Sequence, residues 1–320
     1  MDKKRTKRRY KSAEPEPGKG LPLPDRRAME KSLSDIGRLL SEREFGSPEE
    51  MNAFLQDIVA SGEIPRSSKQ RTLLEQAQDL MYDAWDSSGR RRVELARRAL
   101  EISKDCADAY VLLAEETARS LKEARNLYEQ GVKAGERALG PEAFKEDAGH
   151  FWGILETRPY MRARLGLAQC LWSLGERRQA IEHYTDMLRL NPGDNQGIRY
   201  VLANCLLEEG LDGALGKLLE QYKDDAAATW SYSRALWVFR REGASKKANR
   251  CLKEALDDNR YVPFYLLGEK RLPRRLPEYI GFGDENEAVE YVAEAIRAWQ
   301  KTEGALEWLR GNLPGRPDEA

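Results

Sequence analysis

Hydrophobic and polar positions recur along most of the chain with the three- and four-residue spacing of amphipathic helices. The clearest example opens with the sequence SPEE at residues 47–50, which supplies a capping hydroxyl, a proline suited to the first turn and two acidic residues at the positive end of the helix dipole. Apolar residues then share one face, at Met51, Phe54, Leu55 and Ile58. We therefore predict a helix from about Pro48 to Ala60. The period-two alternation typical of strands is absent, so the expected fold class is all-α.

A spacing of glycine and small residues repeats further along the chain. Intervals of five and then seven residues separate Gly175, Ala180 and Met187, and the same intervals recur at Gly243, Ala248 and Ala255 and at Gly283, Ala288 and Ala295. The first two glycines lie 68 residues apart, with Gly210 near the midpoint. This distance matches two units of the ~34-residue helix-turn-helix repeat of tetratricopeptide proteins. The third glycine follows 40 residues later, so that unit carries a short insertion.

These residue types suit closely packed helix pairs. Glycine just past a helix end adopts the left-handed conformation that closes the last turn. Small side chains such as Ala180 let the second helix of a pair lie close to the first, and Pro192 then stops that helix. We expect about five to six helix pairs.

The chain divides by composition. Residues 1–24 combine a cationic cluster with helix breakers and predict a disordered basic tail, followed by a helical N-terminal extension at 25–68, a repeat domain at 69–313 and a flexible C-terminus at 314–320. Residues 1–11 hold seven Lys or Arg and one Asp, which leaves 46 basic against 53 acidic residues in the rest of the chain. The tail and the body therefore carry opposite charge.

Composition also bounds the function. The charges nearly cancel over the whole chain, with a formal net charge of −1, so bulk charge selects no partner. No apolar stretch approaches the ~18 residues that span a bilayer, and we expect no membrane insertion. Isolated cysteines among apolar neighbours suggest core thiols in a reducing compartment, at Cys106, Cys170, Cys205 and Cys251. We expect a cytoplasmic protein.

Catalytic signals are missing. There is no glycine-rich phosphate loop, no metal-ligand spacing and no nucleophile with a neighbouring base. His150 and Glu156 lie close in sequence, but the expected roles are structural, with the histidine at a helix start and an ion pair between Glu156 and Arg158 before Pro159. We therefore predict a protein that is not an enzyme and that binds no cofactor or metal.

Residues from about 84 to 310 resemble tetratricopeptide-repeat (TPR) proteins. The runs GHFW at 149–152, ETRPYMR at 156–162 and LNPGDNQGIRY at 190–200 look like a largely uncharacterised, mainly bacterial group of them. The C-terminal part, from Gly283 to Trp299 and from Glu303 to Leu306, is also similar to the suppressor-of-tumorigenicity-seven family. The resemblance implies a TPR-like α-solenoid, a right-handed superhelix of antiparallel helix pairs, with a role in protein interaction and no catalytic residues.

In such a superhelix the first helix of each pair lines a concave groove, where a peptide is read. Aligning the chain on Ala168 and Ala203 places seven candidates in this groove: Arg162, Leu165, Gln169 and Trp172 from one unit, with Tyr200, Asn204 and Leu207 from the next. A second cluster of aromatic and basic residues, Trp230, Tyr232, Arg234 and Trp237, lies on one later first helix. The alternative is that Leu165 and Trp172 only pack on adjacent helices, and that the aromatic residues of the second cluster belong to the core.

Two basic segments suggest other ligands. Residues 270–277, KRLPRRLP, interrupt a helix pair, and their four positive charges suit an acidic peptide, a phosphate or RNA; the alternative is a salt-bridged loop that covers neighbouring helices. The tail can bind nucleic acid nonspecifically but has no means to read bases. The predicted function is a scaffold or adaptor that binds a protein or peptide in the groove. The alternative is a nucleic-acid- or ribosome-associated factor tethered by the tail.

Overall fold

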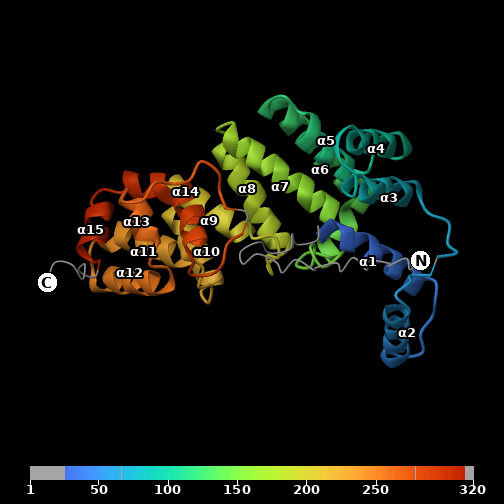
Figure 1. Cartoon of the computed structure of the whole chain (residues 1–320), viewed down its shortest axis with the longest axis horizontal. Helices are drawn as coiled ribbons and strands as arrows, with labels where there is room; N and C mark the ends of the chain where they lie inside the picture. Colours follow the sequence, from blue (N-terminus) through green and yellow to red (C-terminus); the bar gives the residue numbers. More distant parts are fainter. Residues whose placement is uncertain (1–25, 66, 278, 314–320) are drawn as a thin grey trace, which may run out of the picture.

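The computed structural model describes residues 26–65, 67–277 and 279–313 (Figure 1). Helices account for all the regular structure in these residues, and none of them forms a strand. The predicted tail at 1–24 and the predicted flexible end at 314–320 lie outside the described residues. The helices are α1 Arg26–Ser41, α2 Pro48–Ser61, α3 Leu73–Trp85, α4 Gly89–Ile102, α5 Ala107–Thr117, α6 Leu121–Glu146, α7 Arg158–Ser173, α8 Arg177–Leu190, α9 Ile198–Glu208, α10 Asp212–Gln221, α11 Ala228–Glu242, α12 Lys246–Asp258, α13 Val262–Leu266, α14 Glu285–Lys301 and α15 Ala305–Gly311.

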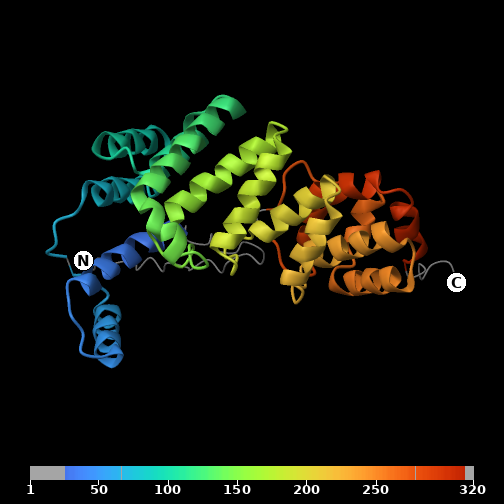
Figure 2. The same cartoon turned by 180° about the vertical axis from the view of Figure 1, so that it is seen from behind.

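Helices α3 to α12 form five consecutive pairs, and in each pair the two helices pack on one another. The pairs stack along the long axis of an elongated molecule (Figures 1 and 2). First helices also contact neighbouring first helices, as α5 contacts α7 and α9 contacts α11. We call the surface formed by α3, α5, α7, α9 and α11 the first-helix face. The fold is thus all-α and TPR-like, as the sequence predicted.

The glycine and alanine residues of the repeat have the predicted roles at the junction of α7 and α8. Gly175 follows α7 with φ +85°, and the next amide, that of Glu176, donates to the carbonyl of Leu171 and closes the helix end. Ala180 and Ala248 are fully buried, as small contact residues must be. At the N-terminal side, α2 begins at Pro48 as predicted, capped by the Ser47 hydroxyl.

The third unit carries the predicted insertion and buries Ala288 and Ala295, but its glycine departs from the prediction. Gly283 has φ +75°, but it follows no helix end, because α13 stops at Leu266 and the chain then runs without helix to α14. Pro273 and Pro277 lie in this connection, and proline disfavours helix in the residue before it. The helix that follows contacts the short α13 and also packs across α9 and α11. Helix α14 therefore covers part of the first-helix face instead of simply extending the stack.

The other end of the first-helix face is covered too. Helix α1 packs against α3, and its Glu30 reaches Arg162 on α7. Helix α2 projects away from the stack beyond α1 (Figures 1 and 2). The chain thus folds one of its own helices over each end of the surface where the sequence predicted a partner.

One large core cluster extends from α5 to α15, with fully buried aromatic side chains at Trp230, Tyr232 and Trp299, and a separate cluster lies between α3, α4 and α5. All four cysteines are buried and unpaired, which confirms the expected core thiols. In the part of the chain that the structure describes, no helix is both long and apolar enough to cross a membrane.

Candidate partner-binding face

Arg162 stands at the centre of a buried ion network. Its guanidinium makes two hydrogen bonds to Asp108 of α5, at 2.8 and 2.6 Å, and two to Glu30 of α1, each at 3.0 Å. The side chain of Asp108 is 0% exposed and that of Glu30 is 5% exposed. Desolvation opposes the charge of Arg162, but Asp108 and Glu30 outweigh it and raise the pKa of the guanidinium. A residue predicted to meet a partner thus meets α1.

Trp85 and Arg158 extend this network. The guanidinium of Arg162 lies 5.2 Å from the Trp85 ring centroid, and that of Arg27 lies 5.1 Å from it. Arg158 binds Glu30 at 3.2 Å and donates to the carbonyl of Trp152. The expected ion pair between Arg158 and Glu156 therefore does not form, because Arg158 pairs with Glu30, which is remote in sequence. These contacts fasten α1 to the stack.

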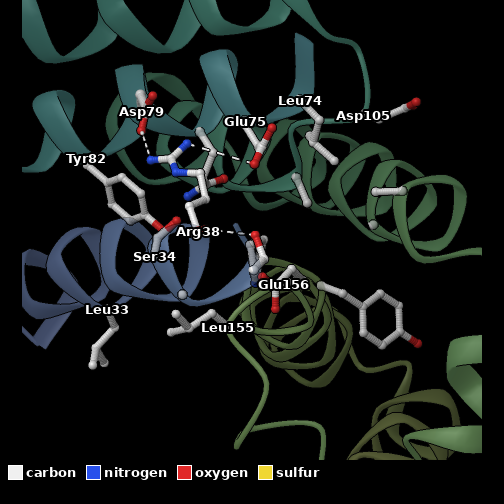
Figure 3. A pocket seen from close by; sticks show the side chains of 18 residues that line it. Leu33, Ser34, Arg38, Leu74, Glu75, Asp79, Tyr82, Asp105, Leu155 and Glu156 are labelled. Carbon is white, nitrogen blue, oxygen red and sulfur yellow. Dashed lines mark hydrogen bonds and ion pairs between the residues drawn. The ribbon is translucent and has the colours of Figure 1, made fainter. Parts of the chain in front are cut away.

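A cavity of about 420 Å³, the N-terminal chamber, lies between α1, α3, α6 and the start of α7. Figure 3 shows Arg38 pointing from α1 toward Asp79 and Glu75 of α3, at 3.7 and 3.9 Å, with Leu155 and Glu156 on another side. Helix α1 therefore forms one wall of this chamber through its own side chains. The ion pairs across the chamber tie α1 to α3.

A second cavity, of about 400 Å³, lies at the other end of the first-helix face. Its walls come from α9, the start of α11, α14 and residues 280–282 before α14. We call it the C-terminal chamber. Tyr200 and Asn204, both predicted from the sequence, line it together. Phe282, at the mouth, is 84% exposed, and Ile280 is 54% exposed.

The polar groups of the C-terminal chamber are mostly acceptors. Asn204 is 9% exposed and donates its amide to Glu294 at 2.5 Å, while its own Oδ1 has no partner. Both Glu290 and Glu294 reach solvent, yet the surrounding helices desolvate their carboxylates. This desolvation raises the pKa of Glu294, and it raises the pKa of Glu290 with help from the charge of Glu287.

Glu287 differs from its two neighbours on α14 because its carboxylate is fully used within the fold. It accepts hydrogen bonds from the Ala228 amide, the Asn259 side chain and the Gly283 amide, at 2.9, 2.9 and 2.7 Å. These bonds join the starts of α11 and α14 to the end of α12. Glu287 thus sets the position of α14, and Glu290 and Glu294 follow on the same helix face three and seven residues later.

The other predicted groove residues lie apart from this chamber. Gln169 is exposed on α7, and Trp172 is half-buried with the Arg177 guanidinium 3.8 Å from its ring centroid. Arg234 donates to the Lys223 carbonyl at 2.9 Å, and Trp237 donates to the Asp212 carbonyl at 2.8 Å. Both therefore point toward α10 and the chain that follows it. Their roles in binding stay predictions.

Some aromatic candidates belong to the core, which is the alternative interpretation of their helical spacing. Trp230 and Tyr232 are 0% exposed, and Tyr232 donates to the Asn259 carbonyl. Tyr200 is half-buried, meets Trp230 edge to face, and donates its hydroxyl to Asp225 at 2.8 Å. Only Tyr200 of these three lines the C-terminal chamber.

The basic segment at 270–277 runs outside any helix and is exposed over most of its length. Lys270 binds Glu285 at 2.6 Å, as a salt-bridged loop predicts. Its other cations are exposed, at Arg271, Arg274 and Arg275. The ligand predicted for this segment stays a hypothesis.

Sequence reasoning missed Glu30, Glu290 and Glu294. A signal for the last two was present, because Glu287, Glu290 and Glu294 follow the spacing of one helix face. Glu30 had no such signal, since its partner Arg162 lies 132 residues away. In the described ranges, no group of three or more His, Cys, Asp or Glu side chains is arranged to hold a metal ion.

Comparison with known proteins places the chain in a family. The model of the ST7 protein family matches residues 68–313, a wider span than the C-terminal similarity noted in the sequence. The suppressor of tumorigenicity 7 protein-like proteins of Bos taurus and Homo sapiens are each 30% identical over 265 residues, covering 76% of this chain and 48% and 46% of their own lengths. The ST7 homolog of Drosophila melanogaster is 29% identical over 263 residues.

The chain spans about half the length of these relatives. Among solved structures, the TPR protein YrrB, described as having an unusual peptide-binding site, aligns with 64% of this chain and 91% of its own at a TM-score of 0.39 and 20% identity. The family match covers most of the described residues. This chain belongs to the ST7 protein family.

Proposed function

We propose that the chain is a non-catalytic scaffold that binds a segment of a protein partner at the C-terminal chamber of its first-helix face. The proposal rests on a difference between the two ends of that face in how far their polar groups are satisfied. At the N-terminal end, Arg162 has its hydrogen bonds filled by Asp108 and Glu30. At the C-terminal end, the chamber keeps an unpartnered acceptor at Asn204 and an 84% exposed aromatic ring at Phe282.

A protein segment suits this chamber better than a small metabolite does. The cavity opens beside exposed Ile280 and Phe282, and large exposed apolar side chains mark surfaces that bury on contact with a macromolecule. Helix pairs stacked in this way present a long surface on which an extended segment lies. The adaptor role follows from that surface and needs no reactive group.

Site-specific photo-crosslinking tests the proposal. A benzophenone amino acid replaces Phe282, or replaces Arg178 on α8 as a control whose side chain is 93% exposed outside the chamber. In lysate from the native host, the proposal expects a discrete protein crosslinked at position 282 and absent at position 178. Adding Val201→Trp, which fills the chamber from α9, must remove that product. The same products at both positions, or none at position 282, count against the proposal.

A further inference from the structure

The chemistry of the C-terminal chamber identifies the kind of side chain it takes. Fourteen residues line it, and among them are three glutamates and no lysine, arginine or histidine. The carboxylate of one of the three, Glu287, already accepts hydrogen bonds from three amide groups of the fold. Glu290 and Glu294 have no ion-pair partner among the described residues. The chamber therefore holds two carboxylates that lack a cation.

Two neutral acceptors in the same wall also lack donors. Asn204 Oδ1 and Gln196 Oε1 are both buried oxygens without a hydrogen-bond partner, and both residues line the chamber. The orientation of the Asn204 amide is fixed, because its nitrogen donates to Glu294 and a flipped amide would set its oxygen against a carboxylate. Buried acceptors without donors are uncommon in native proteins. Two of them beside two unpaired carboxylates indicate a missing donor-rich cation.

We infer that the C-terminal chamber recognises an arginine side chain of the protein partner, with Glu290 and Glu294 meeting the guanidinium charge and Asn204 accepting one of its N–H groups. This inference rests on the proposed function and names the chemistry of its partner. A guanidinium carries five donors in a planar fork, whereas an ammonium carries three at one point. The acceptors of the chamber are spread over α9 and α14, so they suit the wide guanidinium better than the compact ammonium. Phe282 adds an exposed aromatic surface on which a guanidinium can stack.

The desolvation of the two carboxylates supports the assignment. With no cation nearby, the pKa of each glutamate is raised by the surrounding helices. An entering guanidinium offsets this cost, because opposite charges attract more strongly where water is partly excluded. Binding of the cation therefore relieves an unfavourable arrangement that the free chain already contains.

Nuclear magnetic resonance tests the inference on the full chain. The probe is N-acetylarginine amide, and the reporters are the methyl groups of Val201 and Ile280, which line the chamber. A single side chain binds weakly, on the order of millimolar. We expect saturable shifts at both reporters. We also expect about tenfold weaker binding for the citrulline analogue, which keeps the shape of arginine without its charge.

Matched glutamine variants complete the test. Glu294→Gln and Glu290→Gln each remove one charge and should weaken binding of N-acetylarginine amide at least about fivefold. Glu220→Gln removes one charge from an exposed position on α10, outside the chamber, and should leave binding unchanged. Three results would overturn the inference. These are equal binding of the citrulline and arginine probes, no shifts at the Val201 and Ile280 methyl groups, or glutamine variants that bind N-acetylarginine amide as tightly as wild type. Crosslinking at position 282 then decides separately whether the scaffold function stands.

Discussion

Replacing Arg162 by methionine perturbs the network that joins α1, α5 and α7. Methionine keeps much of the apolar volume but removes the charge that Asp108 and Glu30 share. Asp108 is 0% exposed and retains only the Gln78 amide as a partner, at 2.8 Å. Glu30 retains Arg158 at 3.2 Å. Removing one partner from a buried ion pair costs about 3–5 kcal/mol, and because each carboxylate keeps a second donor we expect the lower end, about 3 kcal/mol.

The assay is urea unfolding of the full chain, followed by far-UV circular dichroism. Arg178→Met is the matched control, because the side chain of Arg178 is 93% exposed and its pair with Glu182 is worth less than about 1 kcal/mol. Adding Asp108→Asn to Arg162→Met removes the uncompensated charge and should restore more than half of the lost stability. If Arg162→Met unfolds within about 0.5 kcal/mol of its control, the network does not hold α1 to the stack.

Three further predictions test other parts of the structure. Gly175→Ala should lower the free energy of unfolding by about 1 kcal/mol, because φ is +85° there. Gly213→Ala in α10, where a Cβ meets open space, should leave that free energy unchanged or raise it, and thermal melts of both variants measure the difference. Since the pKa of Glu294 is raised in the folded chain, its ionisation opposes folding above the ordinary value of 4.5; Glu294→Gln should therefore be at least as stable as wild type at neutral pH, and any advantage should vanish as urea unfolding is repeated toward lower pH. Burial raises the pKa of Cys106 to about 12 and also raises that of the other three thiols, so an aromatic disulfide reagent should react with them only after unfolding; rapid reaction of the folded chain would contradict the buried positions.

Local features of the fold were readable from the sequence because their causes are local. The cap at Ser47, the proline that follows it and the left-handed glycine at Gly175 each act within one turn of chain. The buried alanines at 180 and 248 have the same local origin, since closely packed helices favour small side chains at their contacts. The helix pairs and the TPR-like fold were therefore predictable.

The candidate site was predictable only in part, because long-range docking decides it. Tyr200 and Asn204 lie on α9, but the helix that faces them is α14, and Glu294, to which Asn204 donates a hydrogen bond, is 90 residues away in sequence. Arg162 was assigned to an open groove, and its ligand is Glu30 of α1. Helices α1 and α14 lie outside the repeats against which they pack, so no periodicity within those repeats indicates where either helix packs.

Helix α14 lies across α9 and thereby forms the C-terminal chamber. A double variant with cysteine at positions 204 and 294 tests it, using a short, fluorogenic, thiol-specific crosslinker on the folded chain, in which the four native cysteines are buried. We expect rapid intramolecular crosslinking of this pair, whose native side chains are hydrogen-bonded, and none when cysteines stand at positions 178 and 294. Crosslinking at the same rate in both double variants, or in neither, would contradict it.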